Sequence, residues 1–174
     1  MHCRIPPVST ANPPRRKVFM KEDTEIEELV QVCLRAYDPT DISVQTLVGG
    51  DLSLLGSFFG ASIRAGALSG KIYVATEAGD AAVIRGMALW WGPGAEPLSP
   101  EGQEWHRTVY RPDFGNLTEK LLGPRGKVDS WYLSLLAVEP DYQRRGVARA
   151  LIDAVRAKAS ASGELRTAAV NLGF

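Results

Sequence analysis

Apolar positions near the start of the chain recur at helical spacing. Order is expected from about Val18, and Thr24 with Glu27 forms a capping-box pattern just ahead of the apolar run. The pattern predicts a helix over about 25–37, ended by Asp38-Pro39 because the residue before a proline disfavours helical backbone. Its inner face would carry Ile26, Leu29, Val30, Cys33, Leu34 and Tyr37.

A second helix is predicted over about 52–67, with Asp51 as its cap. Leu55, Phe58, Phe59 and Ile63 would face inward. Gly56, Gly60 and Gly66 weaken this prediction, because a glycine costs about 1 kcal/mol relative to alanine inside a helix.

Strand patterns follow. Residues 71–76 and 82–90 are rich in β-formers and flank turn residues at 78–80, which predicts a hairpin. Residues 92–128 are polar and interrupted by glycine and proline, and one or two short helices are expected there. Residues 131–138 carry apolar side chains on both faces, which is typical of a central strand covered on two sides.

A last helix is predicted from Gly146 to about Ala161, with Val147, Leu151 and Val155 on one face. No internal repeat or interdomain linker is visible. With 174 residues, the chain is long enough for one domain and short for two. The division expected is a disordered basic tail at 1–17 and a single domain at 18–174.

Charge and composition narrow the possible partners. Lys+Arg and Asp+Glu each total 20, and a net charge of zero argues against nucleic acid as the main partner. No apolar run approaches the ~20 residues of a membrane-spanning helix. Cys3 falls in the tail and Cys33 on a helical face, so no disulfide framework is indicated and a cytoplasmic location is expected. Without a histidine or cysteine cluster, no metal site is expected.

The segment that carries chemistry is a strand, a short turn and a helix start. The first turn of a helix leaves backbone N–H groups unpaired and bears partial positive charge, so it attracts phosphate. Gly146 would let a pyrophosphate approach the backbone closely, and Ala148 keeps the next turn slim. Arg144, Arg145 and Arg149 add positive charge, so the segment predicts an anion-binding cradle. Taken singly, such a glycine is more often turn chemistry and such arginines more often solvated.

These residues resemble the acetyl-CoA signature of the GNAT N-acetyltransferase family. The matching run is Val138-Glu-Pro140 followed by Gln143-Arg-Arg-Gly146-Val-Ala148, placed between a buried strand and an amphipathic helix. The order of the upstream elements is similar to the family as well, and Trp90-Trp91 with the Gly/Pro stretch after it resembles a fungal subgroup. The resemblance implies an α/β (α+β) fold with a mixed, mostly antiparallel central sheet flanked by helices.

The resemblance also implies roles for individual residues. The backbone of Leu136, Ala137 and Val138 would pair with the pantetheine arm of acetyl-CoA. The pyrophosphate would be held by the run from Gln143 through Arg144, Arg145, Gly146, Val147 and Ala148, with Arg149 close by. The implied reaction is direct attack of an amine on the thioester, with a backbone N–H near Leu136 to Val138 stabilising the oxyanion.

Catalytic side chains are harder to nominate. Glu139 follows the strand directly and could act as a base through a water, although a solvated charge at a strand end is the more frequent interpretation. Asp141 and Tyr142 are expected at the surface. Trp90 and Trp91 alternate faces, so Trp91 could line a substrate cleft, although core packing is the more common fate of either one.

The carboxyl-terminal part departs from the family pattern. Only Glu164 to Phe174 follow the last helix, where the family has further strands and a tyrosine that protonates the thiolate. Asn171-Leu-Gly-Phe174 resembles the end of the family's Y-x-x-x-G-F stretch, but Ala169 stands at the tyrosine position. The C-terminal strands are therefore expected to be missing or irregular, as in a truncated chain, and the exposed strand edge would allow a homodimer.

Three functions follow from these observations. The first is an enzyme that acetylates a small-molecule or peptide amine with acetyl-CoA. The alternative is a catalytically inactive relative that keeps the CoA-binding segment and acts as a binding or scaffolding module. The third, a nucleic-acid module built on the arginines, is disfavoured by the neutral charge.

Overall fold

The computed structural model describes residues 23–78, 80–95, 123, 129–161 and 167–169, and the statements below concern these. The predicted tail, Cys3, nearly all of the 92–128 region and the Asn171–Phe174 stretch lie outside them. The elements in chain order are α1 (Asp23–Ala36), α2 (Ile42–Leu47), η1 (Leu52–Leu54), α3 (Leu55–Ser69), β1 (Lys71–Glu77), β2 (Asp80–Trp91), β3 (Trp131–Val138), η2 (Pro140–Tyr142), α6 (Val147–Ala161) and β4 (Thr167–Ala169).

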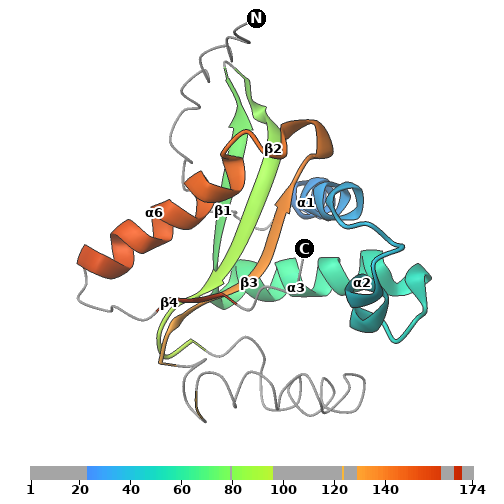
Figure 1. Cartoon of the computed structure of the whole chain (residues 1–174), viewed down its shortest axis with the longest axis horizontal. Helices are drawn as coiled ribbons and strands as arrows, with labels where there is room; N and C mark the ends of the chain where they lie inside the picture. The colour runs from blue at the N-terminus through green and yellow to red at the C-terminus, as the bar shows by residue number, and fades with distance from the viewer. Residues whose placement is uncertain (1–22, 79, 96–122, 124–128, 162–166, 170–174) are drawn as a thin grey trace, which may run out of the picture.

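The strands form one sheet in the order β1-β2-β3-β4 (Figure 1). The β1–β2 and β2–β3 pairs are antiparallel, whereas β4 runs parallel to β3. β4 pairs with β3 at three positions only, from Trp131↔Thr167 to Leu133↔Ala169. The predicted fold class, a mostly antiparallel sheet flanked by helices, is confirmed. The prediction that the C-terminal strands are missing or irregular falls largely outside the described residues.

Helices cover both faces of the sheet, with α1 and α6 on opposite sides (Figure 1). On the α1 and α3 side, Leu29, Phe59 and Ile63 are completely buried in one core cluster. On the α6 side, Leu151 and Val155 are completely buried in a second cluster. The two-sided burial predicted for residues 131–138 is confirmed, and it explains why β3 is apolar on both faces.

Helix boundaries agree with the sequence pattern in most places. Thr24 lies inside α1, so the cap predicted there is wrong. The Asp51 side chain does cap, since it accepts from the N–H of Ser53, but the element it caps is η1, which leads into α3. The short helix α2 was not predicted, although Asp41 marks its start by accepting from Ser43 N–H at 2.8 Å.

One helical stretch, Leu52–Ser69, is long and apolar enough to cross a membrane by length and composition. Within this stretch, Phe59 and Ile63 are completely buried and pack in the core cluster beneath the sheet. Leu52, Leu54 and Leu68 on the same stretch are exposed, so it buries one face against the sheet.

One glycine of α3, Gly66, allows this helix to approach β2 closely. A Cβ at Gly66 would lie 2.2 Å from Leu89 Cδ1, whereas one at Gly56 would meet nothing within 4 Å. Leu89 is itself completely buried, so it has little room to move. Gly66 is therefore required by packing, and its cost in helix propensity is offset by the contact it allows.

This contrast gives a stability prediction. Gly66→Ala should lower the free energy of unfolding by about 1–3 kcal/mol, because the added methyl overpacks against Leu89. Gly56→Ala, on the same helix, should raise it by about 0.5–1 kcal/mol, because alanine loses less backbone entropy. Urea unfolding of both variants measures the difference, and a Gly66→Ala protein as stable as Gly56→Ala would contradict the packing described here.

Cys33 is completely buried, and its thiol lies 3.6 Å from Met87 Sδ. Burial raises the pKa of Cys33 from 9.0 to about 12. The placement of this thiol on the apolar face of α1 is confirmed. A thiol that stays protonated is a poor nucleophile, so Cys33 contributes packing and not reactivity.

The buried thiol makes stability depend on pH. Its pKa is higher in the folded protein, so the stabilisation is fully present below pH 9 and is lost as the pH rises from 9 toward 12. Once the unfolded thiol is ionised, the slope should approach about 1.4 kcal/mol per pH unit. Urea midpoints of wild type and Cys33→Val between pH 8 and 10.5 test this, and equal slopes in the two proteins would refute it.

Candidate cofactor site

The site begins where β3 ends and α6 starts. η2 and the turn 143–146 connect the two elements, and the chain reverses there through two left-handed residues, Arg144 at φ 59° and Gly146 at φ 85°. Glycine adopts this conformation without penalty, whereas Arg144 does so at a cost of order 1 kcal/mol. The backbone strain thus lies in the connection that sets the direction in which α6 begins.

The start of α6 presents unpaired backbone donors. Ala150 N–H bonds to Gly146 O at 2.9 Å, so the N–H groups of Val147, Ala148 and Arg149 precede the first helical hydrogen bond. A Cβ on Gly146 would meet nothing within 4 Å, so the space beside this turn is open. Gln143, Arg144, Arg145, Gly146 and Arg149 are exposed, and Val147 and Ala148 are half-buried. The structure therefore brings the predicted cradle residues together at one helix end.

The strand beside this turn has an outer edge, on the side away from β2. Glu139 N–H bonds to Arg85 O at 2.9 Å, and Ala137 is opposite Met87. In an antiparallel pair only alternate residues point their backbone groups at the partner, so Ala137 faces β2 while Leu136 and Val138 face outward. Of the three backbone positions predicted to bind pantetheine, only Leu136 and Val138 are directed to the outer edge.

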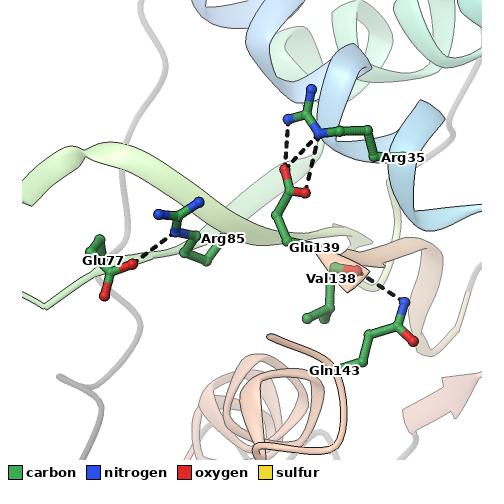
Figure 2. Close-up of polar contacts among 6 residues, drawn as sticks. All are labelled: Arg35, Glu77, Arg85, Val138, Glu139 and Gln143. Atoms are coloured by element: carbon green, nitrogen blue, oxygen red, sulfur yellow. Dashed lines mark hydrogen bonds and ion pairs between the residues drawn. The ribbon is translucent and has the colours of Figure 1, made fainter. Parts of the chain in front are cut away.

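The two outward carbonyl groups, those of Leu136 and Val138, accept hydrogen bonds from side chains. Tyr37 Oη donates to Leu136 O at 3.1 Å. Gln143 Nε2 donates to Val138 O at 3.2 Å (Figure 2). The outward N–H groups of Leu136 and Val138 have no partner among the described residues, so this edge presents donors.

A β-bulge separates this edge from the part of β3 that pairs with β4. Leu89 is opposite Leu135 and Trp90 is opposite Leu133, so Ser134 is an extra residue in β3. Side chains accordingly change phase: Leu133 packs on the α6 side, whereas Leu135 packs on the α1 side. A bulge bends a strand and increases its twist, and here it lies where the described pairing with β4 ends.

Residues 120–172 match the family model described as acetyltransferase (GNAT) domain. The resemblance to the GNAT family is thereby confirmed. A solved structure described as histone acetyltransferase HPA2 and related acetyltransferase, from Corynebacterium glutamicum, is similar over 80% of this chain and 68% of its own, at 23% identity and a TM-score of 0.49. No curated protein matches the chain.

Glu139, the candidate base, is held in an ion pair. Its carboxylate accepts from Arg35 Nε at 3.0 Å and from Arg35 Nη2 at 2.6 Å (Figure 2). Glu139 is only 9% exposed, so the alternative of a solvated charge at a strand end is wrong. The hydrogen bond to Glu139 raises the pKa of Arg35. The pair fixes the last turn of α1 to the end of β3, and a base at Glu139 would have to give up this contact.

The side chains of this ion pair are unequally exposed, at 51% for the Arg35 side chain and 11% for the Glu139 side chain. Arg35→Met should therefore lower the free energy of unfolding by about 1–3 kcal/mol, because it leaves a buried carboxylate unpaired. Glu139→Gln should cost less, because the arginine left behind reaches water. Denaturant unfolding of both variants and the double variant measures the coupling, and equal losses would contradict the asymmetry.

A second polar cluster, formed by Glu77, Arg85, Tyr142 and Arg145, lies beside the cradle. The sequence pattern did not predict that these four side chains meet. The Tyr142 hydroxyl donates to Glu77, and Arg85 Nε bonds to the same carboxylate at 2.9 Å. The guanidinium carbons of Arg85 and Arg145 lie 4.6 and 5.2 Å from the centre of the Tyr142 ring. The hydrogen bonds from Tyr142 and then Arg85 lower the pKa of Glu77. Tyr142 is thus a half-buried anchor that ties the turn to the hairpin.

The two tryptophans confirm the predicted alternation of faces. Trp91 packs on the α1 side and is 3% exposed, while Trp90 packs on the α6 side and is completely buried. Neither indole N–H has a hydrogen-bond partner in the part of the chain described. Trp91, the candidate cleft residue, therefore lies in the core as the structure stands. The same described residues contain no cluster of three metal-ligating side chains.

Proposed function

We propose that this acetyltransferase domain takes its acetyl group from acetyl-CoA and transfers it to an amine. The observation that carries the proposal is the adjacency of two donor surfaces. The open first turn of α6 offers backbone N–H groups and nearby arginines, and the outer edge of β3 offers the N–H groups of Leu136 and Val138. A molecule with a pyrophosphate at one end and a thioester at the other matches both.

The residues present fit the charged end of such a molecule. Phosphate oxygens would accept from the N–H groups of Val147 and Ala148, where the helix dipole favours negative charge. Arg144, Arg145 and Arg149 are exposed residues of this turn and of the first turn of α6, and their guanidinium groups would form charge-assisted bonds to phosphate. Gly146 leaves the approach to the backbone open.

The edge of β3 supports the transfer step. The amine nitrogen would add to the thioester carbonyl carbon and form the C–N bond, which places the carbonyl electron pair on oxygen. The C–S bond would then break as the carbonyl re-forms, and the electron pair of that bond would leave on sulfur. The nitrogen loses a proton to water or a base, and the thiolate gains one from solvent. An outward N–H of Leu136 or Val138 would donate to the oxyanion between these events. Holding both reactants at one edge lowers the entropic part of the barrier.

The alternative function is a CoA-binding relative without turnover, acting as a binding or scaffolding module. One observation favours it: the carboxylate of Glu139, the candidate base, is engaged by Arg35. Turnover separates the two functions, because both require the cofactor to bind. We further propose a small-molecule or peptide amine as acceptor and a cytoplasmic location, for which the buried free thiol of Cys33 is suited.

The experiment that tests the proposal is calorimetric titration of the full chain with acetyl-CoA, with adenosine as control. Saturable binding of acetyl-CoA without binding of adenosine is expected, since the phosphates supply the main contacts. A folded protein that binds neither would refute the proposed function. Release of free thiol during incubation with a panel of amines then separates the enzyme from the inactive module.

A substitution at Gly146 tests directly whether the pyrophosphate binds at the start of α6. Gly146→Glu should weaken acetyl-CoA binding at least about tenfold relative to Gly146→Gln, because only the former places a carboxylate against the pyrophosphate. The glutamine variant is the matched control, since both side chains bear the same strain at positive φ. Equal affinities in two folded variants would show that the phosphates bind elsewhere.

A further inference from the structure

Tyr37 is the first residue after α1, and its hydroxyl reaches the outer edge of β3. The donor–acceptor distance to Leu136 O is 3.1 Å. The Tyr37 ring is supported by Phe59, with ring centroids 5.1 Å apart, and Phe59 is itself completely buried. The hydroxyl is therefore fixed in position by a core contact and does not belong to a mobile surface side chain.

We infer that Tyr37 is a positioning residue for the acyl end of the bound thioester, acting through Leu136. The inference rests on the proposed function. In a strand, the N–H and C=O of one residue point the same way, so the bond to Leu136 O also holds the direction of the outward Leu136 N–H. This restraint matters here because, from Ser134 onward, no described strand pairs with the outer edge.

Tyr37 acts by its hydrogen bond and not by giving up its proton. Burial raises the pKa of Tyr37 to about 12. An alkyl thiol has a pKa of about 8.5, so passing a proton from this phenol to a thiolate would be unfavourable by a factor on the order of 10³. The neutral hydroxyl, by contrast, is present at every pH at which the protein would work.

The same turn of α1 holds β3 at a second point. Arg35 binds Glu139 while Tyr37 binds Leu136, so two side chains from one helix end fix the strand on both sides of Val138. Gln143 bonds to Val138 O, but it is exposed and belongs to the cradle turn. Tyr37 is therefore the contact that can be altered at the acyl end without touching the cradle.

The test compares two ligands in calorimetric titrations of the full chain. Adenosine 3′,5′-bisphosphate occupies only the charged end of the site, whereas acetyl-CoA also occupies the edge of β3. Tyr37→Phe should bind the bisphosphate within about twofold of wild type and acetyl-CoA about tenfold more weakly, the effect of one lost hydrogen-bonding restraint. The ring remains in this variant, so its contact with Phe59 and the fold are kept.

Tyr132→Phe is the matched control, because it removes a hydroxyl from another buried tyrosine, on β3 itself. It should bind both ligands as wild type does. Equal weakening of both ligands in Tyr37→Phe, the same loss in Tyr132→Phe, or unchanged acetyl-CoA affinity in Tyr37→Phe would each overturn the inference. A wild type that binds neither ligand would instead overturn the proposed function.

Discussion

The described structure depends on how β3 satisfies its two edges. β2 pairs with one edge along nearly the whole strand, and the described pairing of β4 with the other edge covers Trp131 to Leu133. Backbone groups that lose a strand partner must find other partners or water. The carbonyls of Leu136 and Val138 accept from Tyr37 and Gln143, and the N–H groups of the same two residues have no partner among the described residues. A strand edge that would otherwise accept another chain is thereby converted into a short row of donors, which suits a small ligand.

Local patterns predicted the elements around this edge well. The hairpin, β3 and α6 agree with the predicted limits within one or two residues, because alternation and helical spacing are properties of neighbouring residues. The glycines of α3 were interpreted as a weakness for the same reason. For Gly66 the reason is its close approach to Leu89, which no local pattern shows. The low helix propensity of glycine destabilises α3, and the tertiary packing that Gly66 allows offsets this loss of stability.

The candidate site was predicted in its backbone and missed in its supporting side chains. Gly146 and the arginines are contiguous in sequence, so a motif could identify them. Arg35 and Glu139 are 104 residues apart, and Glu77 and Tyr142 are 65 apart, so only the fold brings them together. The bulge at Ser134 could not be predicted from the sequence pattern either. A strand that is apolar on both faces gives no sign when its side chains change phase.

These contacts, which the sequence did not predict, hold the outer edge of β3 in position relative to the first turn of α6. The cradle at α6 is open and charged, so it can bind phosphate with little demand on its surroundings. The proposed transfer at the edge of β3 would instead need a donor held close to the developing charge. Among the described residues no strand pairs with this edge beyond Leu133, so other contacts must hold it. Arg35 and Tyr37 supply the missing rigidity from α1. Under the proposed function, phosphate binding at the cradle would survive a poorly held edge, whereas binding of the acyl end would not, and the last turn of α1 is where the two separate.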